Sequence, residues 1–367
     1  MDPAVIFLAG DVMTGRGIDQ ILQQPGSPVL RESHVTDARR YVELAERIHG
    51  RIPTAVPPPY IWGQALLELE GFAPDARIIN LETSVTTSDD FWPEKPIHYR
   101  MHPANVACLT AAGIDICCLA NNHVLDFGSA GLLETLGTLR RAGFQTPGAG
   151  GDLDEAKCPA RVALAGGALI VSALGSPTSG IPSSWAATES RPGVHLLPDL
   201  SERTADTLGA ALADVRRPGD LVLASIHWGG NWGYQVSAQQ VRFAHRLIDS
   251  GVDVVHGHSS HHVRPIELYR GRLILYGCGD LLTDYEGITG YEEYRGDLGL
   301  LYFLRLSRPD GAFVNLRMVP VQQRRLSLEK ATAADARWLA AKLGEISKPF
   351  GTAFRLGADG VISCGGQ

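Results

Sequence analysis

Short apolar segments of this chain alternate with amphipathic segments, and most of the apolar segments end in a polar cluster. The apolar segments are rich in Val, Ile and Leu, which is typical of buried β-strands. The segments between them carry apolar residues at helical spacing. This alternation predicts a layered α/β fold. We expect strands near residues 4–9, 77–81, 114–119, 220–226, 252–256 and 272–276, and helices near 38–48, 60–70, 103–112, 129–142, 203–215 and 236–250.

Residues 146–195 interrupt this order with two loop-like stretches rich in Gly, Pro and Ser. The region is expected to be either the second half of a sandwich or a loop over the site. Beyond residue 297 the pattern becomes strand-like again and then helical. The further strands are expected at 160–165, 168–174, 298–306 and 312–319, with a helix near 333–346 and a short ending around 354–364.

Charge and cysteine content exclude several classes of protein. The net charge is -7, so no basic surplus is available to neutralise a nucleic-acid backbone, and we expect no nucleic-acid partner. The N-terminus lacks a basic leader, and no apolar run reaches the roughly 20 residues of a membrane span. We therefore expect a cytoplasmic protein without a membrane partner. The six cysteines should be reduced and mostly buried, with Cys117 and Cys118 on opposite faces of one strand.

Polar residues follow the predicted strands at five places. Taken alone, each has a structural explanation as a turn, a helix cap or a structural histidine. Because ligands of open α/β sheets bind outside the carboxyl ends of the strands, we expect the five clusters to converge. Carboxylates, an amide oxygen and imidazoles are together a ligand set for a divalent cation. The sequence therefore predicts a metal-dependent active site that gathers Asp11, Glu82, Asn122, His123, His227 and His258.

The ordered set of motifs resembles the CapA-like proteins of the poly-γ-glutamate capsule-synthesis type, a branch of the calcineurin-like metallophosphatase fold. The resemblance extends over roughly residues 4–305. The residues that carry it are Gly10-Asp11 with Met13, Asn80-Leu81-Glu82, Asn121-Asn122-His123 with Asp126 and Gly128, His227-Trp228-Gly229, Gly257-His258 with His261, Pro265-Ile266-Glu267, and Tyr276 with Gly279.

The resemblance implies a four-layer α/β/β/α sandwich with two central mixed sheets. It implies a catalytic domain at residues 1–305, and C-terminal strands and a helix at 306–367 that complete the same domain. It also implies a divalent cation, for which calcium or manganese suits the oxygen ligands best and zinc or iron would suit a site richer in imidazoles. The implied metal ligands are Asp11, Glu82, Asn122, His227 and His258.

The resemblance also implies that His123 is the acid–base group beside the metal. Asp126, three residues later, would orient the imidazole and stabilise its protonated form, or alternatively cap a helix. A second His–Asp pair is expected from His261 or His258 with Asp11 or Asp280, and we assign His261 and Asp280 to it.

Several positions depart from the family pattern. Met13 stands where hydrolytic phosphatases have a histidine, so we expect one cation, or one tight and one weak, in place of a full two-metal site. Asn231 stands where Glu is usual, and Asp280 where Asn is usual. Ser259-Ser260 replaces His-Pro. These changes favour altered chemistry on an inherited scaffold, with surface drift as the alternative.

Three functions fit these residues. We favour a metal-dependent peptide epimerase that inverts the α-carbon of a C-terminal residue in a ribosomal, lasso-type precursor, because CapA-like proteins accompany some lasso-peptide pathways. Inversion needs an acid and a base on opposite faces of the carbon and a cation to stabilise the enolate-like intermediate. The alternative is a metal-dependent hydrolase of a phosphoester, or of an amide such as that in poly-γ-glutamate. The third is a scaffold that keeps the ligands for stability alone.

Four residues are expected to bind the peptide substrate. Trp232 and Tyr234 would contact a bulky side chain, and Arg264 and Arg295 would bind a terminal carboxylate. Residues 284–295 are expected to form a loop that closes over the peptide. The further aromatic candidates are Trp92, Trp228, Tyr285, Tyr291 and Tyr294, and core packing is the alternative for the tryptophans. The sequence leaves open the metal, the substrate sequence, which group is acid and which is base, and the oligomeric state.

Overall fold

The first of two large mixed sheets contains the N-terminal strand. The computed structural model describes residues 2–93, 95–308 and 310–365. In the first sheet the strand order is β18-β19-β16-β15-β1-β2-β5, with β14 beside β1 and β17 beside β16. The bounds are β1 (Ala4–Val12), β2 (Ala76–Leu81), β5 (Ile116–Cys118), β14 (Asp280–Leu282), β15 (Leu298–Leu306), β16 (Phe313–Gln323), β17 (Leu328–Lys330), β18 (Arg355–Leu356) and β19 (Ile362–Gly365).

The second sheet has the order β12-β13-β11-β10-β8-β7, and two short strand pairs lie outside both large sheets. The region 146–195 contributes β7 and β8, so its first interpretation, the second half of a sandwich, is correct for these strands. The bounds are β7 (Ala160–Leu164), β8 (Gly167–Gly175), β10 (Leu221–His227), β11 (Val254–His258), β12 (Ile266–Tyr269) and β13 (Arg272–Leu275), with the short pairs β3 (Ser84–Val85) and β4 (Arg100–Met101), and β6 (Ala149–Gly150) and β9 (Gly193–Val194).

Most of the predicted helices are present, with shifted ends. Two of them divide, since 60–70 and 103–112 each become a 3₁₀ turn followed by an α-helix. The short helices α1 and α6 were not predicted. The helices are α1 (Arg16–Ile21), α2 (Arg39–His49), α3 (Ala65–Phe72), α4 (Ala107–Ala111), α5 (Gly128–Arg141), α6 (Leu153–Lys157), α7 (Glu202–Val215), α8 (Ala238–Asp249) and α9 (Ala333–Ser347), with 3₁₀ turns η1 (Tyr60–Trp62), η2 (Pro103–Asn105), η3 (Pro177–Ser179), η4 (Ser183–Trp185), η5 (Glu292–Tyr294) and η6 (Lys348–Phe350).

Three hydrophobic cores separate four layers. The core between the sheets contains alternate residues of β1, such as Ile6 and Leu8, with Val171 and Leu223 of the second sheet. The other face of the first sheet packs on helices that include α3 and α5. The outer face of the second sheet packs on α7 and α8, where Phe243 is fully buried. The layers are therefore helices, sheet, sheet and helices, which is the calcineurin-like α/β/β/α sandwich that the sequence predicted.

The two adjacent cysteines of β5 show how the strand divides these cores. Cys117 packs in the core beneath the helices, and Cys118 packs between the sheets. The prediction that they face opposite ways is confirmed. All six cysteines are free thiols, and five are buried, with Cys158 exposed.

The C-terminal strands extend the first sheet. β16 pairs with β15 along its length, and β19 pairs with β16. The division of the chain at residue 305 stays a prediction. Among the described residues, no helix has both the length and the apolar character needed to cross a bilayer.

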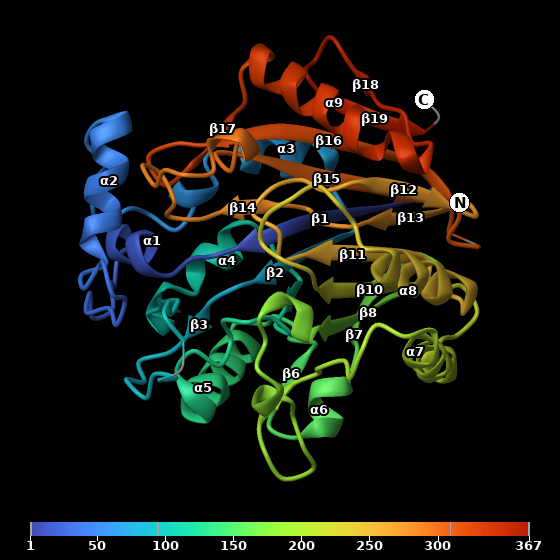
Figure 1. Ribbon diagram of the computed structural model, residues 1–367, viewed down its shortest axis with the longest axis horizontal. Helices are drawn as coiled ribbons and strands as arrows, with labels where there is room; N and C mark the ends of the chain where they lie inside the picture. Colours follow the sequence, from blue (N-terminus) through green and yellow to red (C-terminus); the bar gives the residue numbers. More distant parts are fainter. Residues whose placement is uncertain (1, 94, 309, 366–367) are drawn as a thin grey trace.

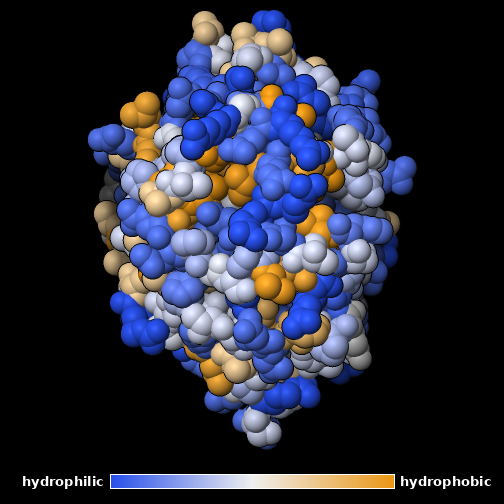
Figure 2. Space-filling view, turned by 90° about the vertical axis from the view of Figure 1, so that its left-hand side faces the viewer, coloured by the Kyte–Doolittle hydropathy of each residue, from blue (hydrophilic) through white to orange (hydrophobic). Residues whose placement is uncertain are grey.

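The parallel strands of both sheets point the same way. β1 runs parallel to β2 in the first sheet, and β10 runs parallel to β8 and β11 in the second. Their carboxyl ends point to the left in Figure 1. On the face seen from that side, scattered hydrophobic patches lie among hydrophilic residues (Figure 2). Polar residues at these strand ends are therefore brought to one end of the sandwich.

Candidate active site

Five predicted ligands come from the ends of five parallel strands. Asp11 lies near the end of β1, and Glu82 directly follows β2. Asn122 follows β5 after a short turn. His227 and His258 are the last residues of β10 and β11, where they are paired in register. The two sheets thus contribute carboxylate and amide oxygens from one side and imidazoles from the other.

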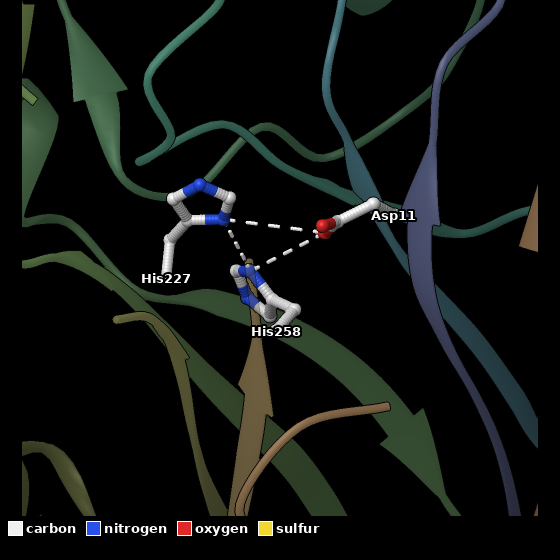
Figure 3. A group of neighbouring side chains, drawn as sticks. All are labelled: Asp11, His227 and His258. Atoms are coloured by element: carbon white, nitrogen blue, oxygen red, sulfur yellow. Dashed lines mark hydrogen bonds and ion pairs between the residues drawn. The ribbon is translucent and has the colours of Figure 1, made fainter. Parts of the chain in front are cut away.

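Asp11, His227 and His258 point toward one another (Figure 3). Each offers one ligand atom, and these atoms all lie within 4.8 Å of one another. Nδ1 of His227 is 2.8 Å from Nδ1 of His258, and Oδ1 of Asp11 is 4.0 Å and 3.8 Å from these two nitrogens. All three side chains are buried. The three ligand atoms are therefore close enough together to bind one cation.

Glu82 and Asn122 adjoin the same group through His227. Oε1 of Glu82 is 3.9 Å from Nε2 of His227, and Oδ1 of Asn122 is 3.0 Å from the same nitrogen. The structure therefore brings all five predicted ligands together. Their role as metal ligands stays a prediction.

Backbone geometry fixes the position of Asp11. A side chain at Gly10 would lie 1.7 Å from the Gly279 carbonyl oxygen, so β1 can approach that segment only with glycine there. The Asp11 amide donates to the same carbonyl at 3.0 Å. Ser259, at φ +97, donates its amide to Oδ2 of Asp11 at 3.1 Å, and Asn80 donates its side-chain amide to Oδ1 at 2.6 Å.

The charges of this group fit a divalent cation. Burial, followed by repulsion from Asp280, raises the pKa of Asp11, and burial together with repulsion from Asp11 raises the pKa of Glu82. Burial lowers the pKa of both His227 and His258 well below the usual value, so both imidazoles are neutral and each has an unprotonated nitrogen that can bind a cation. In their ionised forms, the two adjacent buried carboxylates would be stabilised by a bound cation, which the neutral imidazoles could also coordinate.

His123 and Asp126 form a hydrogen-bonded pair beside this group. Nδ1 of His123 is 2.6 Å from Oδ2 of Asp126, and Nε2 of His123 is 3.8 Å from Oε1 of Glu82. The Asp126 carboxylate also accepts from the Tyr99 amide at 2.7 Å and from the ammonium of Lys95. Helix α5 begins at Gly128 without a side-chain cap. Of the two interpretations of Asp126, the orienting carboxylate therefore agrees with the contacts and the helix cap does not.

Burial and charge set the protonation of this pair. Burial lowers the pKa of His123 to about 4, although the neighbouring Asp126 acts in the opposite direction. Burial also acts to raise the pKa of Asp126, but the charges of His123 and Lys95 outweigh it and hold that pKa below the usual value. His123 is therefore neutral near pH 7, with Nδ1 donating to an ionised carboxylate.

His261 and Asp280 form a second pair on the other side of Asp11. Nδ1 of His261 is 3.0 Å and 3.1 Å from the two carboxylate oxygens of Asp280. Asp280 pairs with Asp11 across β14 and β1. Burial acts to lower the pKa of His261, but the charge and the hydrogen bond of Asp280, together with the charge of Asp11, outweigh burial and raise it. The two histidine pairs therefore have different proton affinities, and both adjoin the predicted ligands.

Two tyrosines connect the histidine pairs. The ring of Tyr99 stacks on His123 at 3.8 Å, and the ring of Tyr285 lies edge-on to His261 at 5.4 Å. The two tyrosine hydroxyls are hydrogen-bonded to each other. His123 and His261 keep 8% and 12% of their side chains exposed, against 1% and 2% for His227 and His258. The proton-transfer candidates are thus more accessible than the ligand candidates.

The predicted substrate residues divide into two groups. Trp232 lies beside His261, at 5.2 Å between ring centroids, and stacks on Tyr291 at 4.0 Å. Tyr234 is 5.3 Å from Tyr294. These rings form an aromatic cluster next to the second histidine pair. Of the other aromatic candidates, Trp228 is a core residue, since it packs on α8 and donates to a backbone carbonyl.

Both arginines make contacts within the protein. Arg264 is buried and donates to the backbone carbonyls of Gln235 and Gly230, so it holds the loop that carries Trp232, while its Nε atom makes no hydrogen bond to any described residue. Arg295 forms ion pairs with Asp297 and Asp335 through Nε and Nη2. The binding of a substrate carboxylate by these arginines stays a prediction.

The residues that depart from the family pattern lie near Asp11, His227 and His258, and none of them is a histidine. The sulfur of Met13 accepts from the Gly15 amide, and the Ser260 hydroxyl donates to the His262 carbonyl. Asn231 contacts Nε2 of His261 at 3.0 Å, so it belongs to the second pair. Among the described residues, one group of three metal-binding side chains is present.

Lys95 lies beside His123 and Asp126 at the candidate site, and it was not among the residues predicted from the sequence. Its ammonium contacts the Asp126 carboxylate and the Asn122 backbone carbonyl, and lies 3.3 Å from Nδ1 of His123. It comes from a loop without regular secondary structure, so neither a strand end nor a periodic pattern marked it. Tyr99, stacked on His123, was missed for the same reason.

The fold and the site define a calcineurin-like metallophosphatase-type protein whose strand-end residues fit a divalent cation. A family model agrees with this class. The chain belongs to the family described as bacterial capsule synthesis protein PGA_cap, whose model matches residues 5–285.

Individual relatives agree with this membership. The chain is 49% identical over 352 residues to a probable polyglutamine synthesis accessory protein of Mycobacterium tuberculosis, a match that covers 95% of this chain and 93% of the relative. It is 26% identical to the PGA biosynthesis protein CapA of Bacillus subtilis, covering 75% of this chain and 62% of the relative. It is also 26% identical to the capsule biosynthesis protein CapA of Bacillus anthracis, covering 89% and 69%.

Proposed function

We propose that this protein is a metal-dependent peptide epimerase, which inverts the α-carbon of a C-terminal residue in a ribosomal, lasso-type precursor peptide. The observation that carries the proposal is the presence of two histidine–carboxylate pairs, His123 with Asp126 and His261 with Asp280, at one group of predicted metal ligands. A hydrolase needs one such pair to protonate its leaving group. Two pairs are what proton removal on one face and proton return on the other require.

The hydrogen bonds select the nitrogen that each imidazole offers to a substrate. Asp126 occupies Nδ1 of His123, which leaves Nε2 on the side of Glu82. Asp280 occupies Nδ1 of His261, and Nε2 is 3.0 Å from the Asn231 side-chain amide, so a substrate would reach Nε2 by replacing that contact. Each carboxylate would stabilise the imidazolium formed when its histidine takes a proton. We assign one histidine to proton removal and the other to proton return, with the roles exchanged in the reverse direction.

The predicted ligands Asp11, Glu82, Asn122, His227 and His258 would hold the cation, which we propose to be calcium or manganese. When bound, the cation would supply Lewis-acid stabilisation of the negative charge that develops on the carbonyl oxygen as the α-proton leaves. Trp232 would contact the side chain of the residue being inverted, because it lies next to His261. Tyr234, which lies next to His262 and Tyr294, would extend the same aromatic surface. The lasso-type precursor rests on the association of CapA-like proteins with such pathways.

A second candidate is a hydrolase of an amide polymer. The Mycobacterium tuberculosis relative is named for polyglutamine synthesis, and the Bacillus subtilis relative for PGA biosynthesis. These names suggest a polymer for the candidate reaction without specifying the reaction. In this candidate the protein would hydrolyse an amide bond in a polymer such as poly-γ-glutamate, with His123 protonating the leaving nitrogen. Both candidates share one substrate class, a chain of residues joined by amide bonds, and both place the protein in a peptide or polymer synthesis pathway.

One experiment separates the two candidates. The purified protein is incubated in deuterium oxide with calcium or manganese and with synthetic peptides that differ in their C-terminal residue, and in parallel with poly-γ-glutamate and polyglutamine. Mass spectrometry and chiral amino-acid analysis follow the products, with and without chelator. A gain of about one mass unit without cleavage, lost on chelation, supports epimerisation. Release of shorter fragments supports hydrolysis and contradicts the epimerase.

A pair of variants controls for activity from a contaminating enzyme. His123→Ala should lose the reaction, whereas His34→Asn, at an exposed position, should keep it. Neither exchange nor cleavage with any of these substrates, in a protein that chelator nevertheless destabilises, would favour the non-catalytic scaffold over both enzymes.

A further inference from the structure

A cavity of about 670 Å³ lies away from the candidate active site, on the outer side of the second sheet. One wall is a face of α7 that includes Leu208 and Ala211, spaced along the helix so that they share one side. The opposite wall is the end of α6 with residues 194–199. In Figure 1, α6 and α7 lie at the lower part of the molecule, apart from the strand ends that carry the predicted ligands.

The cavity has the size and depth of a small-molecule site. Pockets that bind small ligands usually enclose about 300–1,000 Å³ and are lined mainly by apolar side chains. Here Ser172 of β8 and His195 form part of the lining, and both are buried, with 4% and 9% of their surface exposed. A flat protein-docking surface would not reach such residues.

His195 is a buried polar group without a partner. Its Nδ1 atom makes no hydrogen bond to any described residue. Leaving such a group unsatisfied costs free energy. Nδ1 itself is closed to solvent, so a turn of the ring is needed to bring it to a ligand atom in the cavity. The imidazole is held there by its backbone, since the His195 amide donates to Gly148 and its carbonyl accepts from Gly175.

Cationic side chains stand at the cavity. Lys157 and Arg203 line it, and both side chains are exposed. The lining also contains Asp199, whose Oδ1 already accepts from the Ser201 amide and the Thr204 hydroxyl. Hydrogen bonds from Ser201 and Thr204, together with the charge of Arg203, lower the pKa of Asp199. Two cationic side chains against one carboxylate give the lining a net positive charge.

We propose that this cavity binds a small amphipathic carboxylate, with its apolar chain between α7 and residues 194–199 and its carboxylate at Lys157, His195 and Arg203. An apolar lining with a cationic group at its edge complements an apolar chain with an anionic head. The site is independent of the proposed epimerase reaction, since none of the predicted catalytic or metal residues lines it.

Isothermal titration calorimetry with decanoate, kept below the concentration at which it forms micelles, tests the proposal. Decanoate should bind one site per chain, and decanol should bind more weakly because it lacks the charge. Lys157→Gln and Arg203→Gln should each weaken decanoate binding about threefold to fivefold, the usual range for a partly exposed charge pair. Arg217→Gln, a neighbouring arginine outside the cavity, is the control.

Blocking variants locate the binding. Ala211→Trp places an indole in the cavity and should weaken binding at least tenfold, whereas Ala210→Trp, one residue away and outside the lining, should not. Thr207→Trp is a second blocking variant should Ala211→Trp fail to fold, as judged by thermal melting. Both blocking variants should retain the exchange reaction.

Three results would overturn the proposal. These are equal affinity of the Ala210→Trp and Ala211→Trp proteins for decanoate, equal binding of decanol and decanoate, and binding to anionic lipid vesicles without binding of monomeric decanoate. The last result would assign this face to a membrane surface.

Discussion

Nδ1 of His123 lies 2.6 Å from Oδ2 of Asp126, and this contact determines which imidazole nitrogen faces the predicted ligands. Since an ionised carboxylate only accepts hydrogen bonds, Nδ1 carries the proton and Nε2, 3.8 Å from Glu82, is the basic nitrogen. The sequence spacing of three residues suggested the pair but left a helix cap open. The orientation of the ring is thus a property of the folded site.

Removal of this pair should abolish turnover without removing the cation. We expect His123→Ala to lower the exchange rate by about a hundredfold or more, the usual range for loss of a general acid or base. Asp126→Asn should also lower the exchange rate, because the imidazole of His123 loses the carboxylate that orients it. Metal content, measured by plasma mass spectrometry, should stay close to wild type in His123→Ala. Loss of the metal there would make His123 a ligand.

Lys95 should act on the reaction through Asp126. Lys95→Met leaves the Asp126 carboxylate with one cationic neighbour fewer and frees the Asn122 carbonyl, so we expect kcat to fall with little change in KM. Lys95→Arg should restore part of the activity, since it keeps the charge. Steady-state kinetics with the peptide substrate give both constants. A change in KM alone would place Lys95 in substrate binding instead.

Replacing the predicted ligands should lower metal content. Glu82→Ala and His227→Ala each remove a donor from the buried group, so the occupancy of calcium or manganese should fall in both. Met13→Leu is the matched control, because it changes a buried neighbour that offers no imidazole or carboxylate. Full occupancy in both ligand variants would contradict their assignment.

Two tryptophans should behave differently on truncation. Trp228 is buried against α8, so Trp228→Ala should destabilise the protein by about 3–5 kcal/mol. Trp232 stacks on the half-exposed Tyr291, and Trp232→Ala should raise KM for the peptide with a smaller loss of stability. Urea denaturation and kinetics on the same samples check both. Equal stability losses would place Trp232 in the core.

His195 should make stability depend on pH. Burial lowers its pKa from 6.5 to about 4, so as the pH falls the unfolded chain takes up the proton first. The folded state is then disfavoured, and stability present above pH 6.5 is lost progressively down to about pH 4, by up to about 3 kcal/mol. His195→Asn should flatten the stability profile in this window, whereas His34→Asn should not. Denaturant titrations at a series of pH values measure the difference.

Much of the fold followed from local pattern. The strands that carry the predicted ligands, β1, β2, β5, β10 and β11, were located to within a few residues, because buried strands are short and apolar and end in polar residues. Short elements such as β3, β14 and α1 were missed, since two to six residues hold too little periodicity. Arg264 and Arg295 were assigned to substrate from residue type alone, whereas their neighbours decide what their donors contact.

Local pattern was enough to place Asp11, Glu82, Asn122, His227 and His258 at strand ends, because strand length and side-chain alternation are local properties of the chain. The meeting of the oxygens of the first sheet with the imidazoles of the second is a property of the folded protein. That meeting depends on how the two sheets pack across the core between them, where His256 of β11 is hydrogen-bonded to the carbonyl of Ala9 in β1 at 2.8 Å. An apolar pattern specifies which face is buried, and not which other face will cover it.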